Sequence, residues 1–222
     1  MNIDLKMPTR LTYFIATTTA TIVIFISGCN PQNNISISVD TADVGAKSVT
    51  TSNDQKPTIL LAKEPIIPLQ TVLDAALNGK TDAIQQAIDS KFDLNSSNEQ
   101  KRSAVMLAAF NGHTDIVKLL VRNGASPNLR DTSGRTALMF ASTGNNQDIV
   151  EFLIVSGAEL NAVDHSEGFT ALMFAAAEGQ TDVVRTLLKY KADALIKDAD
   201  GESALGFATK NGHVETAKLL TK

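Results

Sequence analysis

The sequence has little cysteine, no tryptophan and no excess of positive charge. Its one cysteine, Cys29, excludes a disulfide framework within the chain. The 20 lysines and arginines are outnumbered by 24 acidic residues, which gives a formal net charge of −4. Because nucleic acids are bound by basic surfaces, this balance argues against a nucleic-acid partner. The sequence also lacks a glycine-rich loop of the kind that cradles a phosphate.

Residues 1–28 are predicted to be a secretory signal peptide. Lys6 and Arg10 precede an uncharged run from Leu11 to Gly28 that ends in small residues. Its last residues and Cys29, ISGC, resemble a bacterial lipobox. The resemblance implies that the leader is cut before Cys29 and that the thiol is lipidated. Because Asn30 rather than Asp follows, the sorting rule of enteric bacteria implies an outer-membrane lipoprotein that faces the periplasm.

The same apolar run leaves an alternative open. Its eighteen residues are just long enough to cross a bilayer. An uncleaved signal anchor, with the rest of the chain facing the cytoplasm, is therefore the competing interpretation, although the many threonines make a poor span. Residues 29–66 are predicted to be the lipidated cysteine and a flexible linker, because they are rich in Asn, Ser, Thr and Asp and show no sustained period.

A short string of residues recurs through the rest of the chain. Thr136–Ala141 reads TALMFA, and the same six letters begin at Thr170. The frame also fits at Ser103 and Ser203, and more weakly at Gln70, with spacings of 33, 33, 34 and 33 residues. Small residues in one helix of each unit and aliphatic residues in the next, at this period, indicate a repeat array.

Several positions of these repeats resemble the ankyrin consensus, D-x-x-G-x-T-P-L-H-x-A-A-x-x-G-H followed by an aliphatic helix and G-A-x-x-N. The resemblance implies an all-α solenoid of helix-turn-helix repeats joined by β-turn fingers. It covers residues 67–222, with five repeats at about 67–97, 98–130, 131–163, 164–197 and 198–222. The matching residues are Asp131, Gly134, Thr136, Leu138 and Ala141, then Ala108, Ala109, Gly112, His113, Gly124, Ala125 and Asn128, then Gly157, Ala158 and Asn161.

Each recurring position has a physical reason. Paired alanines in the first helix of a repeat allow close packing, and an acid at the start of each second helix complements the helix dipole. Aliphatic residues spaced i, i+3 and i+4 in the second helices form a buried face. The alanines are Ala75, Ala76, Ala108, Ala109, Ala175 and Ala176, and the acids are Asp82, Asp115, Asp148, Asp182 and Glu215. The aliphatic residues are Val117, Leu120, Val121, Ile149, Val150, Leu153, Val183, Val184, Leu187, Leu188, Leu219 and Leu220.

The sequence also departs from the consensus. Met139 and Met173 stand where T-P-L-H has histidine. Lys91 and Lys191 replace the glycine that ends a second helix, which costs about 1 kcal/mol each where the left-handed geometry is kept. The remaining replacements are Ala137 and Ala171 for proline, Asn145 and Asn146 for Gly-His, and Leu195 for the closing asparagine.

The sequence predicts no enzyme, no cofactor and no small-molecule substrate. His113 and His213 occupy the Gly-His position and are expected to be structural. His165 lies in a finger with Asp164 and Glu167, which is the basis of a less favoured alternative, a metal-dependent enzyme. These three residues are close in sequence within an exposed loop, so no metal site is predicted.

The resemblance implies instead that the chain binds a partner protein through a concave face lined by fingers and first helices. Phe110 and Phe169 are either exposed contacts of high binding energy or partly buried against a neighbouring repeat. Arg102 and Arg135 are expected to hold a partner carboxylate, and acids near the C-terminal end are expected to face basic groups. The predicted partner-binding residues are Glu99, Arg102, Phe110, Arg135, Glu167, Phe169, Asp200 and Glu202.

Overall fold

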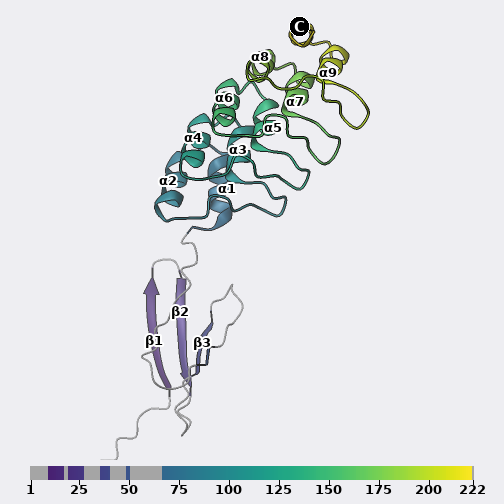
Figure 1. The fold of residues 1–222 in the computed structure, drawn as a ribbon. Helices are drawn as coiled ribbons and strands as arrows, with labels where there is room; N and C mark the ends of the chain where they lie inside the picture. Colours follow the sequence, from purple (N-terminus) through teal and green to yellow (C-terminus); the bar gives the residue numbers. More distant parts are fainter. Residues whose placement is uncertain (1–9, 18–19, 28–35, 41–48, 51–66, 222) are drawn as a thin grey trace, which may run out of the picture. The chain divides into compact units, whose positions relative to one another are not determined.

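The computed structural model describes residues 10–17, 20–27, 36–40, 49–50 and 67–221 (Figure 1). Contacts divide the chain into two units, Met1–Ala62 and Lys63–Lys222. The first unit contains a four-stranded antiparallel sheet in the order β1-β2-β3-β4. Its strands are β1 (Arg10–Thr17), β2 (Ala20–Ser27), β3 (Ser36–Asp40) and β4 (Val49–Thr50).

The strands of this sheet are rich in β-branched and aromatic residues. Arg10 pairs with Ser27 and Thr17 with Ala20, so the two long strands form a hairpin rich in Ile, Val, Thr and Phe. Strand β3 reads SISVD, and this alternation of polar and apolar residues is the period of a strand with one apolar face. β3 and β4 lie within residues 29–66, which the sequence predicts to be the lipidated cysteine and a flexible linker.

Two expectations for the N-terminal unit have no structural outcome. The predicted signal peptide overlaps β1 and β2, and the other residues of 1–28 lie outside the described part of the chain. Cys29 also lies outside the described residues. Among the residues that the structure describes, no helix is both long and apolar enough to cross a membrane.

The second unit is a stack of helical hairpins in two layers (Figure 1). The first helices of the repeats form one layer and the second helices form the other. The first helices are α1 (Leu69–Leu77), α3 (Ala104–Phe110), α5 (Ala137–Ser142), α7 (Ala171–Ala177) and α9 (Ala204–Lys210). The second helices are α2 (Thr81–Asp89), α4 (Thr114–Arg122), α6 (Gln147–Val155), α8 (Thr181–Lys189) and α10 (Val214–Leu220).

The core lies between neighbouring repeats and matches the predicted pattern. The paired alanines of α1, α3 and α7 are buried, as the close packing of first helices requires. In the second helices, Leu120, Leu153 and Leu187 are fully enclosed. Met106, Met139 and Met173 are buried as well, which confirms that this recurrent methionine is a packing residue.

Four of the five first helices, α3, α5, α7 and α9, begin at a serine or threonine cap, whereas α1 begins after Pro68 without a side-chain cap. Thr136 Oγ1 accepts a hydrogen bond from the backbone N–H of Met139, and Thr170 does the same for Met173. In return each methionine sulfur accepts the backbone N–H of its threonine, at 3.5 and 3.4 Å. Methionine thus closes a reciprocal capping box at the position where the consensus has histidine.

Lysine occupies three left-handed positions. Lys91 and Lys191 keep the geometry of the glycine they replace, with φ of 56° and 68°. Lys101 also has φ of 56°, in a turn where the later repeats have Gly134, Gly168 and Gly201, and the sequence reading missed it. These side chains extend into solvent, and each position carries a backbone cost of about 1–2 kcal/mol.

Candidate functional site

The loops between repeats form the predicted fingers, which project from one side of the stack (Figure 1). Each finger is closed by a backbone hydrogen bond between its ends, for example from Asp131 N to the Arg135 carbonyl at 3.0 Å. The closing bonds define fingers at residues 98–102, 131–135, 164–169 and 198–202. The finger of the fourth repeat is one residue longer than the others, which accounts for the spacing of 34 residues. We call the surface of these fingers and the first helices that follow them the finger face.

An acid or amide at the start of each finger holds its turn. Asp164 Oδ1 accepts the backbone N–H groups of Glu167, Gly168 and Phe169 at 2.9–3.1 Å. Asp198 Oδ1 accepts two N–H groups in the same way, and Asn98 accepts one. These oxygens accept hydrogen bonds from the backbone of their own fingers, so Asp164 and Asp198 have a structural role.

Neighbouring fingers are also joined to one another. Thr132 N donates to the Gln100 carbonyl, His165 N to the Ser133 carbonyl and Ala199 N to the Glu167 carbonyl, at 2.8–3.0 Å. The backbone of the finger face is therefore fixed both within each turn and between turns. Side chains on it are presented from a rigid surface, which lowers the entropy that binding would cost.

A cluster of two arginines and two phenylalanines lies where the second and third repeats meet on this face. Arg135 and Arg102 both lie over the ring of Phe140, with the guanidinium carbon 4.9 and 5.6 Å from the ring centroid. Phe110 meets the same ring edge to face, at 6.1 Å between centroids. The Phe140 ring itself is buried, so it forms the base on which the other three side chains lie.

Asp131 is the negative charge of this cluster. Its side chain is 1% exposed, and Arg135 donates to Oδ2 from both Nε and Nη2, at 3.1 and 2.9 Å. The other oxygen accepts the backbone N–H groups of Ser133 and Arg135. Because a buried carboxylate is costly without partners, the two hydrogen bonds from Arg135 stabilise this finger. The sequence predicts that Arg135 holds a carboxylate of the partner. In the structure its guanidinium instead binds the carboxylate of Asp131 in the same finger.

The two predicted aromatic contacts have different environments. Phe110 is 53% exposed at the end of α3. Phe169 is half-buried, and its ring packs against Phe174 and Phe207 at 5.5 and 4.9 Å between centroids. Phe110 is therefore exposed, and Phe169 is partly buried between repeats.

The remaining predicted contacts are acidic. Glu99, Glu167 and Asp200 are exposed at finger tips, while Glu202 is half-buried and its side chain covers the position of Gly206. Each lies on the finger face, but the array separates Glu99 from the three acids of the last two fingers. Among the residues that the structure describes, no three His, Cys, Asp or Glu side chains are grouped so that they could hold a metal ion.

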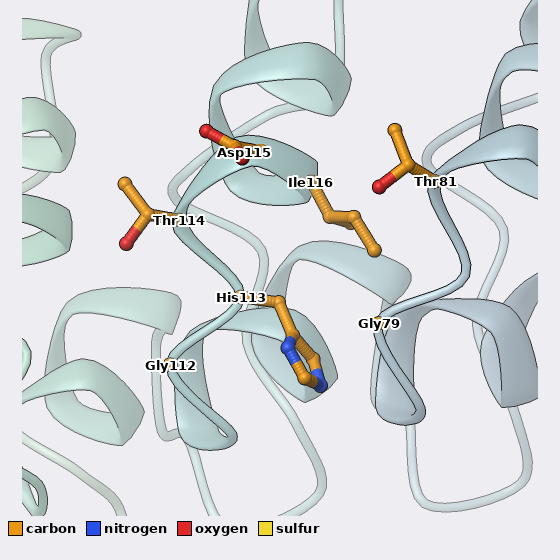
Figure 2. Close-up of a pocket in the computed structure, with 7 residues that line it drawn as sticks. All are labelled: Gly79, Thr81, Gly112, His113, Thr114, Asp115 and Ile116. Carbon is orange, nitrogen blue, oxygen red and sulfur yellow. The ribbon is translucent and has the colours of Figure 1, made fainter.

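A surface pocket lies between the first two repeats, away from these residues (Figure 2). Figure 2 shows His113 pointing toward the loop at Gly79, where its Nε2 donates to the Leu77 carbonyl at 3.0 Å. His213 makes the equivalent bond to Ala177, and Asn146 and Gln180 reach Ala109 and Thr143 from the same position. The structural role predicted for His113 and His213 is confirmed, and the pocket is the space beside one of these inter-repeat bonds.

One ionic cluster joins the second helices α6 and α8. Lys189 Nζ and the Tyr190 hydroxyl both donate to Glu151 Oε1, at 2.9 Å. The bond from Lys189, followed by that from Tyr190, lowers the pKa of Glu151, and the bond to Glu151 raises the pKa values of Lys189 and Tyr190. The three groups are solvated at the helix layer opposite the fingers, so they connect repeats rather than contribute to the finger face.

Phe140 is the residue of the cluster that sequence reasoning missed. It stands four residues after the capping hydroxyl, and Phe174 and Phe207 stand at the same position of the next two repeats. A phenylalanine that recurs in register in the first helix was the available signal. Its ring supports both arginines, so the cluster depends on it.

Comparison with known proteins agrees with this architecture. A family model described as ankyrin repeats (3 copies) matches residues 72–164 and 146–222. A search of curated proteins gives no match. Ankyrin repeats serve as scaffolds for protein–protein interaction and are typically not enzymes. The recurring helical pairs, the closed fingers and the family match together establish that this chain belongs to the ankyrin-repeat family.

Proposed function

We propose that the chain is a lipid-anchored protein that faces the periplasm and binds a partner protein without enzymatic chemistry, through its finger face. The observation that carries the binding proposal is the exposure of Phe110. A ring that is 53% exposed beside Arg102, on a backbone fixed by turn and inter-finger bonds, has the composition of an interface anchor. Phenylalanine and arginine are both enriched at such surfaces.

The anchoring part of the proposal rests on the sequence. ISGC follows an apolar leader, and Cys29 is the only thiol of the chain, at the position where the lipid would be attached. A mature chain with no other thiol also suits an oxidising compartment. Asn30 favours the outer membrane under the enteric sorting rule.

The partner is sought with the whole tagged chain as bait in an envelope extract. A stably captured protein should be lost, or its affinity should fall about tenfold, when Phe110 is replaced by alanine. Val155→Ala is the matched control, because Val155 is also apolar and 63% exposed but lies in α6, in the opposite helix layer. Equal capture by the wild type and Phe110→Ala, with loss in Val155→Ala, would move the binding site to the second helices.

Orientation is tested separately. Protease added to intact cells, and then to cells with a permeabilised outer membrane, should digest the repeat domain only after permeabilisation. Digestion that requires rupture of the inner membrane would instead place the domain in the cytoplasm and support the signal-anchor alternative.

A further inference from the structure

Arg102 makes no side-chain hydrogen bond within the described part of the chain, although its charge lies near Asp131 and the Phe140 ring. Its Nε lies 3.8 Å from Asp131 Oδ2, too far for a hydrogen bond, because Arg135 already donates twice to that oxygen. The same Nε is enclosed and has no hydrogen-bond partner among the described residues. Two guanidinium groups thus share one carboxylate, and the surplus positive charge belongs to Arg102.

This guanidinium is nevertheless held in place. Its carbon lies 5.6 Å from the Phe140 ring centroid, and the backbone N–H of Arg102 donates to Asn98 Oδ1 at 2.9 Å. The side chain is 39% exposed although Nε is enclosed, so solvent reaches other parts of it. A planar cation with its stem fixed and terminal donors free is suited to receive a carboxylate through two parallel hydrogen bonds.

The position of Phe110 at the end of its first helix recurs in every repeat, and it holds a large apolar residue in the first two repeats only. Phe110 touches Phe140, as Arg102 does, and Leu77 is the equivalent residue of the preceding repeat, 40% exposed on the neighbouring helix α1. The equivalents in the following repeats are Thr143, Ala177 and Lys210. The apolar part of this series therefore ends at Phe110, which packs on the same Phe140 ring as the Arg102 guanidinium.

We propose that the segment of a partner protein that docks here presents a carboxylate beside a large apolar side chain, the carboxylate on Arg102 and the apolar group on Phe110 and Leu77. This inference rests on the proposed function and specifies the partner chemistry. A single carboxylate matches the single surplus charge of the cluster. A phosphate group would bring a second negative charge close to Asp131, and the phosphoserine peptide below distinguishes it from a carboxylate.

The test uses fluorescent decapeptides of glycine and serine that carry Glu and Leu two residues apart, so that both side chains lie on one face of an extended segment. Matched peptides have Gln for Glu, Ala for Leu, or phosphoserine for Glu. Binding to the full chain is measured by fluorescence anisotropy. The Glu-Leu peptide should bind about tenfold more tightly than the Gln peptide, and more tightly than the Ala and phosphoserine peptides.

Variants separate the two contacts. Arg102→Met should abolish the preference for Glu over Gln and keep the preference for Leu over Ala, whereas Phe110→Ser should do the reverse. Arg102→Lys should retain part of the Glu preference, because it keeps the charge and loses the fork. Arg122→Met is the matched control, since Arg122 also lies over a phenylalanine, Phe152, but in the second-helix layer.

Each outcome bears on the proposal. Equal binding of the Glu and Gln peptides, a Glu preference that survives in Arg102→Met, or tighter binding of phosphoserine overturns it. If a partner captured from the envelope binds Arg102→Met as tightly as the wild type, this inference fails and the proposed function stands. If the wild type captures no protein and selects no peptide, both fail. Thermal unfolding of each variant shows that lost binding is not lost folding.

Discussion

Replacing Leu153 by alanine tests the stacking of the repeats most directly. Leu153 is fully buried in α6, which packs against both α4 and α8. The change removes three carbon atoms, worth about 2.5 kcal/mol in transfer free energy alone. Because helices on both sides hold the site open, part of the cavity should remain, and the total loss should be about 2–5 kcal/mol of unfolding free energy.

The assay is urea unfolding of the full chain followed by circular dichroism. With a slope of about 2 kcal/mol per molar urea, the midpoint should fall by about 1–2.5 M. Val155→Ala deletes apolar atoms from the same helix at a 63% exposed position, and Gln147→Ala changes an exposed residue at its start, so both should move the midpoint little. Equal midpoints for Leu153→Ala and Val155→Ala would show that the buried face of α6 is wrongly assigned.

Three further predictions concern single groups. Arg135→Met should lower the free energy of unfolding by about 1–3 kcal/mol in urea, because the enclosed carboxylate of Asp131 loses two hydrogen bonds. Arg185→Met is the control and should cost almost nothing, because Arg185 and its partner Asp182 are both exposed. Similar losses of stability in the two variants would refute the reasoning. At neutral pH the wild type should have a higher melting temperature than Glu151→Gln. This difference should vanish as the pH falls below the ordinary glutamate pKa of 4.5 toward the lowered pKa of Glu151. A difference in melting temperature that grows on acidification would contradict this reasoning. Cys29→Ser should leave an unprocessed precursor that is larger by the leader, and normal processing would remove the lipobox proposal.

The repeat frame was predictable because it depends on periodic burial. Leu120 and Leu153 stand at the same position of successive second helices, and both are buried as the period requires. Ala108, in a first helix, is buried for the same reason. The left-handed geometry of Lys91 and Lys191 could also be predicted, since neighbouring repeats have glycine there. Local patterns thus determined the helices, the fingers and the faces that meet.

The Arg102 cluster could not be predicted in the same way. Whether Arg102 or Arg135 takes Asp131 depends on how two fingers and one helix meet, which no spacing in the sequence encodes. The burial of Phe169 likewise depends on the rings of Phe174 and Phe207 in its own and the following repeat. Strand β3 was missed for a different reason, since its alternation spans only five residues.

The bonds from His113, Asn146, Gln180 and His213 all run in one direction, from a later repeat to the first helix of the repeat before it. Their separations are 36 or 37 residues. A ribosome adds about 5–20 residues per second, so the donor of each bond is synthesised about 2–7 s after the carbonyl that accepts it. Each of the first four repeats thus receives this bond from its successor, so during synthesis the most recently made of them still lacks it.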